Sequence, residues 1–285
     1  MPASIARRGF LAAPLLALPA FANDATSQLA ELERRNGGRL GVAVLDTASG
    51  HRVGHRADEL FPLCSTFKFL AAAFVLARVD RGEEKLDRRV VFAEKDLVTY
   101  SPVTKDHVGP GGMSMAEICE AALTLSDNTA GNLMLASFGG PSGLTSFARS
   151  LGDRTTRLDR IETELNEAKP GDPRDTTTPA AMLDTMQRLL IGDALSPASR
   201  DRLIGWLLAS KTGARRLRAG LPADWRVGDK TGSGDNGTAN DVAIAFPPGR
   251  APILLSAYYT ESTIADDARS TVIADAARLA VAGLS

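Results

Sequence analysis

A serine and a lysine three positions apart, in Ser65-Thr66-Phe67-Lys68, form the spacing in this chain that most suggests chemistry. On a helix, residues three apart lie on one face, one turn apart. The lysine would then lie beside a hydroxyl that is otherwise a poor nucleophile. In the first turn of a helix, unpaired N–H groups also favour negative charge. This spacing is common by chance, so it indicates a nucleophilic serine only with support from other parts of the chain.

A second polar cluster, Ser126-Asp127-Asn128, lies between two apolar segments with helical periodicity. Serine, aspartate and asparagine all favour the N-cap of a helix. On its own, this cluster therefore predicts the start of a helix rather than a catalytic group.

The tripeptide Lys-Thr-Gly occurs twice, at 211–213 and 230–232. The second copy continues into Ser233 and follows an expected strand. A lysine and hydroxyls in nearly extended backbone suit a substrate carboxylate, and glycines allow close approach of a ligand, although a plain hairpin turn would also explain them. The first copy follows an expected helix, where Gly213 suits a C-terminal cap. We interpret the first copy as structural and the second as the candidate site.

A long polar loop, 154–178, shows little periodicity. Loops of that length inside a compact domain are usually functional or disordered. Glu162 and Asn166 are four positions apart and could hold one water between them on a helical turn. Arg160 and Asp175 could pair across the neck of the loop. A solvated charged loop is the alternative interpretation.

The elements that must position these groups follow from hydrophobic periodicity. We expect two strands near the start and three near the end to share one antiparallel five-stranded sheet, with terminal helices on one face. An inserted helical region would form a second lobe, and a cleft between lobes is a common ligand site. The expected strands are 39–47, 51–56, 226–230, 241–246 and 253–259; the expected helices are 25–35, 65–80, 114–125, 128–137, 141–151, 179–191, 197–209 and 266–282. This predicts a discontinuous α/β domain (23–60 and 209–285) and an all-helical domain (61–208) that includes the loop 160–175.

Net charge argues against a nucleic-acid-binding protein, and the N-terminus indicates export. The chain has 285 residues and a net charge of −1, which gives no electrostatic footprint for nucleic acid or an anionic membrane. Residues 1–22 read as a signal peptide: paired arginines at 7–8, a short apolar run and a small-residue cleavage site. The paired arginines favour a twin-arginine signal over an ordinary secretory one. No later apolar run is long enough for a transmembrane helix, so we expect a soluble mature protein.

Two cysteines, Cys64 and Cys119, lie in apolar helical contexts, and we expect both to be buried free thiols. The three histidines do not lie at metal-ligand spacing from them. The sequence therefore predicts neither a metal site nor a cofactor.

The order serine-lysine, Ser-Asp-Asn and Lys-Thr-Gly in an exported protein is the motif set of class A β-lactamases and penicillin-binding proteins. Over essentially its whole mature length the chain resembles a class A serine β-lactamase. The stretch 160–179 is very similar to that family's omega loop. The resemblance implies the serine β-lactamase/transpeptidase-like fold and hydrolysis of penicillin- and cephalosporin-type antibiotics, which confers antibiotic resistance.

The resemblance also implies roles for individual residues. Ser65 would attack the lactam carbonyl, and the N–H groups of Ser65 and Ser233 would form the oxyanion hole. Either Lys68 or Glu162, through water, would take the serine proton. Ser126 would pass a proton to the leaving nitrogen. Glu162 with Asn166 would activate the hydrolytic water.

The remaining implied roles concern substrate binding. Some family members have a carboxylate-binding arginine where this chain has Ala239, and Arg216 matches an alternative arginine of other members. Substrate spectrum does not follow from these residues. The implied binding residues are Asn128 for the acylamide side chain, Tyr100 at the cleft mouth, and Lys230, Thr231, Ser233 and Arg216 for the carboxylate.

Two family disulfides lack their partners here. Cys64 would pair with a cysteine where this chain has Gly234, and Cys119 with one where it has Ala72. The resemblance implies a periplasmic or secreted monomer that acts on small molecules without cofactors. The alternatives are a D,D-peptidase or penicillin-binding protein, which shares the first three motifs, and a penicillin-binding sensor. Glu162 and Asn166 argue against the former, and the missing membrane anchor against the latter.

Overall fold

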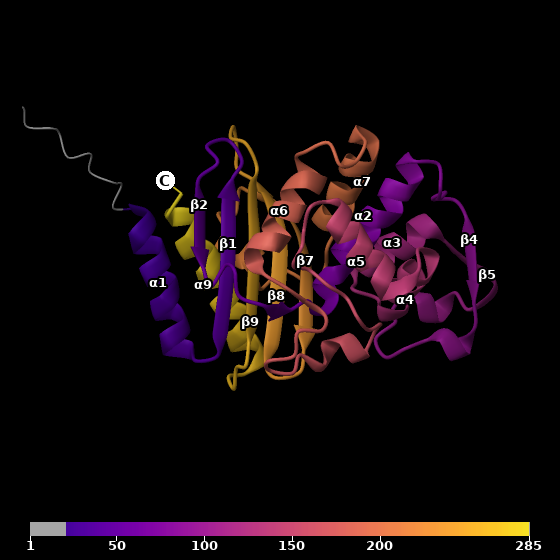
Figure 1. Ribbon diagram of the computed structural model, residues 1–285, viewed down its shortest axis with the longest axis horizontal. Helices are drawn as coiled ribbons and strands as arrows, with labels where there is room; N and C mark the ends of the chain where they lie inside the picture. The colour runs from indigo at the N-terminus through magenta and orange to yellow at the C-terminus, as the bar shows by residue number, and fades with distance from the viewer. Residues whose placement is uncertain (1–20, 285) are drawn as a thin grey trace, which may run out of the picture.

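A five-stranded antiparallel sheet with the order β2-β1-β9-β8-β7 forms the centre of the α/β part (Figure 1). The computed structural model describes residues 21–284, so the predicted signal peptide lies outside the described residues except for its last two positions. The five-stranded sheet predicted from the sequence is confirmed. Its strands are β1 (Arg39–Asp46), β2 (Arg52–His55), β7 (Arg226–Gly234), β8 (Thr238–Phe246) and β9 (Ile253–Thr260).

Two terminal helices, α1 (Phe21–Asn36) and α9 (Asp266–Ala282), cover one face of this sheet (Figure 1). Leu29 of α1 and Ile273 of α9 are fully buried in one hydrophobic cluster with sheet residues such as Leu255. Successive side chains of a strand point to opposite faces of the sheet, so Val42 and Val44 of β1 join this layer while Ala43 and Leu45 join the cluster on the other face.

The opposite face of the sheet packs against the helical region. Tyr258 and Ile244 of the sheet belong to the same hydrophobic cluster as the helical residues Phe69 and Leu76, so one core joins the two parts of the chain. Each of the six helices lies within two residues of its predicted bounds. They are α2 (Phe67–Asp80), α3 (Met115–Thr124), α4 (Asn128–Ser137), α5 (Gly140–Ser150), α6 (Pro179–Leu190) and α7 (Pro197–Leu208).

Capping residues in the sequence explain where several helices begin. The Ser114 hydroxyl oxygen accepts from the N–H of Glu117, and the Glu117 carboxylate accepts from the N–H of Ser114. This reciprocal pair is a capping box. Thr178 and Ser196 cap α6 and α7, each followed by a proline that suits the first helical turn.

Some elements of the middle region are absent from the sequence prediction. Two pairs of short antiparallel strands are not among the strands predicted from the sequence. The pairs are β3 (Phe61–Pro62) with β6 (Thr176–Thr177), and β4 (Arg89–Phe92) with β5 (Gly109–Ser114). The short helical elements are η1 (Cys64–Thr66), η2 (Glu94–Asp96), η3 (Thr104–Asp106), η4 (Glu164–Glu167) and α8 (Leu217–Gly220).

Among residues 21–284, no helix combines the length and apolar character needed to cross a membrane.

Candidate active site

Ser65 lies in the 3₁₀ turn η1 directly ahead of α2, rather than within the α-helix as the spacing suggested. Cys64 before it has a φ of 43°, in the left-handed region that a non-glycine residue rarely adopts. Lys68 lies in the first turn of α2, and its Nζ donates to Ser65 Oγ over 2.8 Å. The predicted serine-lysine pairing is therefore present, and Ser65 keeps 7% exposure.

Glu162 reaches the same serine from the long loop. Its Oε1 lies 3.0 Å from Ser65 Oγ and 2.8 Å from Lys68 Nζ. The side chains of Lys68 and Glu162 are both fully buried. Burial lowers the pKa of Lys68, while the Glu162 charge acts in the opposite direction. The hydroxyl thus has an amine and a carboxylate within hydrogen-bond distance, which is the arrangement that activates a nucleophile.

Ser126 joins this group from the segment between α3 and α4. Lys68 Nζ donates to its carbonyl over 2.9 Å, and Lys230 Nζ donates to its hydroxyl over 3.0 Å. Ser126 has a φ of 60°, and Asp127 is the residue that caps α4. The helix-cap interpretation therefore holds for Asp127, and the Ser126 hydroxyl faces the two lysines. Burial, and then the charge of Lys68, lowers the pKa of Lys230 well below its usual range.

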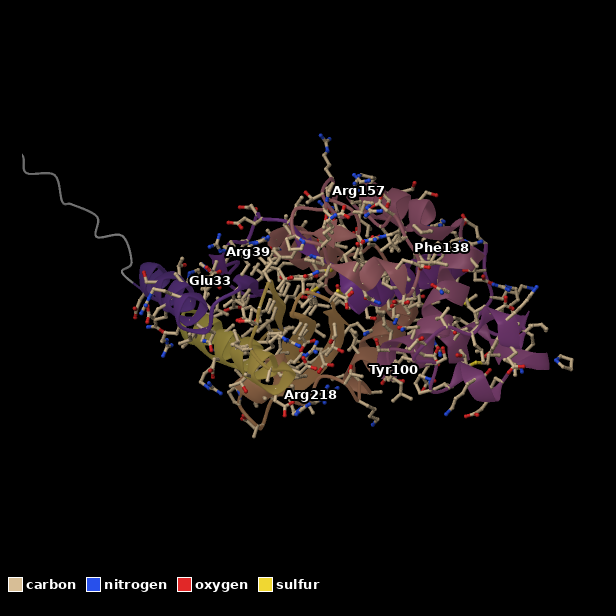
Figure 2. The ribbon with its side chains drawn as sticks, turned by 90° about the horizontal axis from the view of Figure 1, so that it is seen from below. Glu33, Arg39, Tyr100, Phe138, Arg157 and Arg218 are labelled. Carbon is tan, nitrogen blue, oxygen red and sulfur yellow. The ribbon has the colours of Figure 1, made fainter. Side chains whose placement is uncertain are left out.

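Asn128 and Tyr100 complete the helical side of the site. Asn128 accepts from Lys68 Nζ over 2.6 Å, and its Nδ2 donates to the Thr99 carbonyl. Tyr100 has a φ of 64° and is 56% exposed. Figure 2 shows Tyr100 at the same edge of the molecule as Arg218, near the boundary between the helical region and the sheet.

Strand β7 forms the opposite wall, at the edge of the sheet. Arg216 donates to the Gly232 carbonyl over 2.6 Å and to Ser233 Oγ over 2.7 Å. Lys230, Thr231 and Ser233 lie on this edge strand, and the guanidinium of Arg216 lies beside them as a second cationic group. The predicted residues Ser65, Tyr100, Ser126, Asn128, Asn166, Thr231, Ser233 and Arg216 line one cavity of about 330 Å³.

The long loop holds Glu162 through its own contacts. Asn166 Nδ2 donates to Glu162 Oε2 over 2.5 Å, which places the predicted pair side by side. Arg160 Nε donates to Asp175 Oδ2 over 2.6 Å, so the predicted pairing across the neck is also present. The Glu162–Thr163 peptide bond is cis.

Two asparagines that support the site were missed in the sequence. Asn132 of α4 accepts from the Glu162 N–H and donates to the Glu162 carbonyl, each over 2.9 Å. Asn240 of β8 donates to the Pro62 carbonyl over 2.8 Å, just before the turn that carries Ser65. Neither residue lies in a local pattern that signals a site.

The first Lys-Thr-Gly copy requires a correction. Helix α7 ends at Leu208 with Ala209 as its C-cap, so Gly213 is not a helix cap. A Cβ on Gly213 would lie 2.2 Å from Asp229 Oδ2, which is why glycine fits there. Thr212 lines the cavity, and its hydroxyl lies 2.6 Å from that of Thr231. The helix-cap explanation was therefore wrong, and Thr212 lies at the cavity rather than away from it.

Both cysteines are buried free thiols, as the sequence indicated. A Cβ on Gly234 would lie 2.7 Å from Cys64 Sγ, so this position is adjacent to the thiol but holds no cysteine. Burial raises the pKa of the Cys64 thiol. Within the described part of the chain, no group of three or more His, Cys, Asp or Glu side chains is placed to hold a metal ion.

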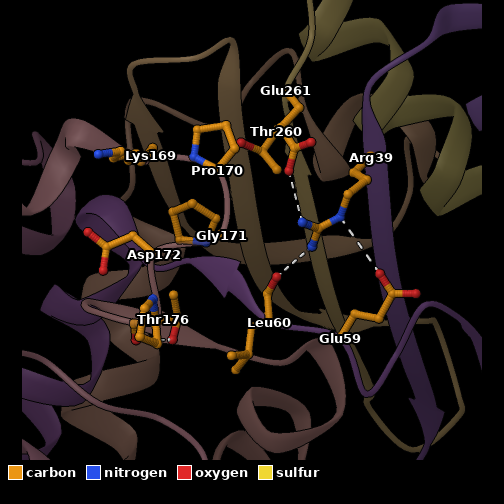
Figure 3. A pocket seen from close by; sticks show the side chains of 13 residues that line it. Arg39, Glu59, Leu60, Lys169, Pro170, Gly171, Asp172, Thr176, Thr260 and Glu261 are labelled. Carbon is orange, nitrogen blue, oxygen red and sulfur yellow. Dashed lines mark hydrogen bonds and ion pairs between the residues drawn. The ribbon is translucent and has the colours of Figure 1, made fainter.

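A second cavity, of about 400 Å³, lies behind the loop, between residues 168–173 and the sheet (Figure 3). Arg39, one of the charged residues that line it, contacts Glu261, Glu59 and the Leu60 carbonyl. Because Ser65, which contacts Lys68 and Glu162, does not line this second cavity, the cavity at Ser65 is the candidate active site.

Comparison with known proteins identifies the same family that the motifs indicated. The family model "Beta-lactamase enzyme family" matches residues 24–284. Beta-lactamase CTX-M-8 of Citrobacter amalonaticus is 49% identical over 266 residues, which cover 93% of this chain and 91% of that protein. Beta-lactamase AST-1 of Nocardia asteroides is 51% identical over 260 residues, covering 91% and 84%.

Solved structures agree with these sequence matches. The ancestral (GNCA) class A β-lactamase has a TM-score of 0.89 and 66% identity, covering 90% of this chain and 98% of that one. The putative class A β-lactamase PenP from Rhodopseudomonas palustris has a TM-score of 0.89 and 62% identity, covering 92% and 99%. With Ser65 lining the cavity and in contact with Lys68 and Glu162, the chain belongs to the class A β-lactamases.

Proposed function

We propose that this protein hydrolyses the amide bond of β-lactam antibiotics through an acyl-enzyme on Ser65. A single observation carries the proposal: Ser65 Oγ contacts Lys68 and Glu162, and Glu162 also contacts Asn166. A nucleophile for acylation therefore lines the cavity, and a carboxylate for deacylation lies within hydrogen-bond distance of it. A penicillin-binding protein that only becomes acylated has no need of the second group.

In the first step, Ser65 Oγ would attack the lactam carbonyl carbon while Lys68 or Glu162 takes its proton. As the carbon–nitrogen bond breaks, Ser126 would give a proton to the nitrogen, and Lys68 and Lys230 flank its hydroxyl. The N–H groups of Ser65 and Ser233 would bind the oxyanion. Losing one such donor typically costs about 10²–10³ in rate.

In the second step, water would attack the ester, and the Ser65 oxygen would leave with a proton. The Asn166 Oδ1 is buried without a hydrogen-bond partner among the described residues, so it can accept from that water. The Glu162 carboxylate beside it would take the water proton.

Charge favours an anionic substrate. Arg216 lines the cavity, Lys68 contacts Ser65 and Lys230 contacts Ser126, while Glu162 is the carboxylate that contacts Ser65. We assign binding of the substrate carboxylate to Thr231, Ser233 and Arg216, beside Lys230. Asn128 would bind the acylamide group, and Tyr100 would lie at the mouth of the cavity.

Loss of β-lactam absorbance tests this function. The wild type should hydrolyse penicillins and cephalosporins, and Ser65→Ala should lose more than about 10³ in kcat/KM. Intact-protein mass spectrometry should detect no adduct on that variant. An adduct on Ser65→Ala, or a wild type that is acylated but never releases product, would reject the proposal.

The N-terminal sequence supports export. We propose that residues 1–22 direct the protein to the periplasm or the medium. Cell fractionation of the full chain against a version with Arg7 and Arg8 changed to lysine separates the twin-arginine route from the ordinary secretory route, because the former depends on the paired arginines.

A further inference from the structure

Thr212 lies inside the cavity although it belongs to the first Lys-Thr-Gly copy. Its side chain lines the same cavity as Ser65 and Thr231. The Thr212 and Thr231 hydroxyl oxygens are 2.6 Å apart, which is a short hydrogen bond. The Ser210 hydroxyl lies 3.5 Å from Thr212 on the other side. Three hydroxyls therefore form a row that ends at Thr231.

The backbone around Thr212 is fixed from both parts of the molecule. The Lys211 N–H donates to the Thr124 carbonyl at the end of α3, over 2.8 Å. On the sheet side, Gly213 packs directly against the buried Asp229 carboxylate. The Leu217 N–H donates to Asp241 Oδ2 over 3.1 Å. Because these contacts do not involve the Thr212 hydroxyl, changing that hydroxyl leaves the loop in place.

Each hydroxyl has only one proton to donate. If Thr212 donates to Thr231, the proton of Thr231 is free for an acceptor in the cavity. A row of hydroxyls that donate in one direction is also strengthened by mutual polarisation. Lys230 and Arg216 add positive charge near Thr231, which favours an anion as that acceptor.

We infer that Thr212 is a positioning residue for the substrate carboxylate: it donates to Thr231 and so directs the Thr231 hydroxyl proton toward the carboxylate. This inference rests on the proposed hydrolysis of β-lactams. It gives the first Lys-Thr-Gly copy a role in binding that its exposed lysine does not share.

The test compares a penicillin with its methyl ester, which lacks the carboxylate charge. Thr212→Val, which removes the hydroxyl at similar volume, should lower kcat/KM for the free acid about 10-fold, the effect of one hydrogen bond to a charged system. The loss should appear mainly in KM. The methyl ester should show no comparable loss, Thr212→Ser should restore the wild-type value, and Lys211→Ala serves as the neighbouring exposed control.

A double-mutant cycle separates action through Thr231 from an independent effect. In a Thr231→Val background, Thr212→Val should have no further effect. Additive losses, equal losses for acid and ester, or no loss with the acid would each overturn the inference, as would a Thr212→Ser variant as impaired as Thr212→Val. Thermal melting curves show whether each variant is folded. A wild type inactive on the free acid would instead refute the proposed function.

Discussion

At the scale of single residues, charge at Lys68 decides which group can activate Ser65. Burial favours the neutral amine of Lys68, and Glu162 favours the ammonium form. A neutral Lys68 can accept the serine proton, whereas an ammonium leaves that task to Glu162. The two assignments predict different responses to removing the Glu162 charge.

Glu162→Gln should lower the pKa of Lys68 further, since it removes the charge that raises it. If Lys68 is the base, the acidic limb of the acylation rate should move to lower pH, and acylation should persist. Stopped-flow acylation from pH 4 to 9 checks this. A loss of acylation by about 10²–10⁴ at every pH would instead assign general-base catalysis to Glu162.

The two Lys-Thr-Gly copies also differ at this scale. Lys230 is fully buried with its Nζ on Ser126, whereas Lys211 is exposed. Lys230→Ala should therefore lower kcat/KM for a penicillin at least about 10-fold, the loss expected for one charged hydrogen bond. Lys211→Ala should be nearly neutral. Equal losses in the two variants would contradict the assignment.

At the scale of elements, the position of Glu162 depends on α4 as well as on its own loop. Asn132 holds both backbone groups of Glu162, and Arg160 with Asp175 closes the neck of the loop. Asp175 also accepts from the N–H groups of Asp159 and Arg160. The loop is thus ordered by polar contacts around one carboxylate.

Asn132→Ala should release the backbone of Glu162 while leaving Ser65 and Lys68 in place. Because misplacing a catalytic group by about 1 Å can cost about 10²-fold, we expect kcat to fall by that order. The burst of acylation should remain. Rapid-quench kinetics with a penicillin measures both phases, with Ser142→Ala on α5 as a control; a slower burst with unchanged turnover would disprove this role.

Sequence patterns predicted elements better than the contacts between them. The six helices of the helical region were located within two residues, whereas α1 begins at Phe21, four residues before its predicted start. Strand β5 begins Gly109-Pro110-Gly111-Gly112 and has no apolar alternation to reveal a strand. Ser65, Lys68 and Glu162 could be grouped because they lie in recognisable motifs. Asn132 and Asn240 could not, since their partners lie 30 and 178 residues away. The division into two domains stays a prediction.

At the scale of the whole molecule, ion pairs connect the first helix to the sheet. Glu33 of α1 accepts from Arg56, from the Leu40 N–H of β1, and contacts His55 of β2. Burial raises the pKa of Glu33, but the hydrogen bonds outweigh it and lower the pKa to about 2. The folded protein therefore stabilises the ionised carboxylate of Glu33 more than the unfolded chain does.

The free energy of unfolding should therefore carry a contribution from Glu33 that is fully present above its ordinary pKa of 4.5. That contribution should be lost as the pH falls from about 4.5 toward about 2. Glu33→Gln should cost about 1–2 kcal/mol at pH 7 and flatten the pH dependence in this window. Urea unfolding at pH 7 and pH 3 measures it, with exposed Glu94→Gln as control. An unchanged pH slope in Glu33→Gln would refute the assignment.

The central claim is that Ser65 forms the acyl-enzyme and Glu162 with Asn166 removes it. Intact-protein mass spectrometry after mixing with a penicillin tests it most directly. The wild type should return to its free mass once substrate is consumed, while Glu162→Ala should keep a persistent adduct of one penicillin on Ser65. If Glu162→Ala clears the adduct as fast as the wild type, the account of deacylation is contradicted.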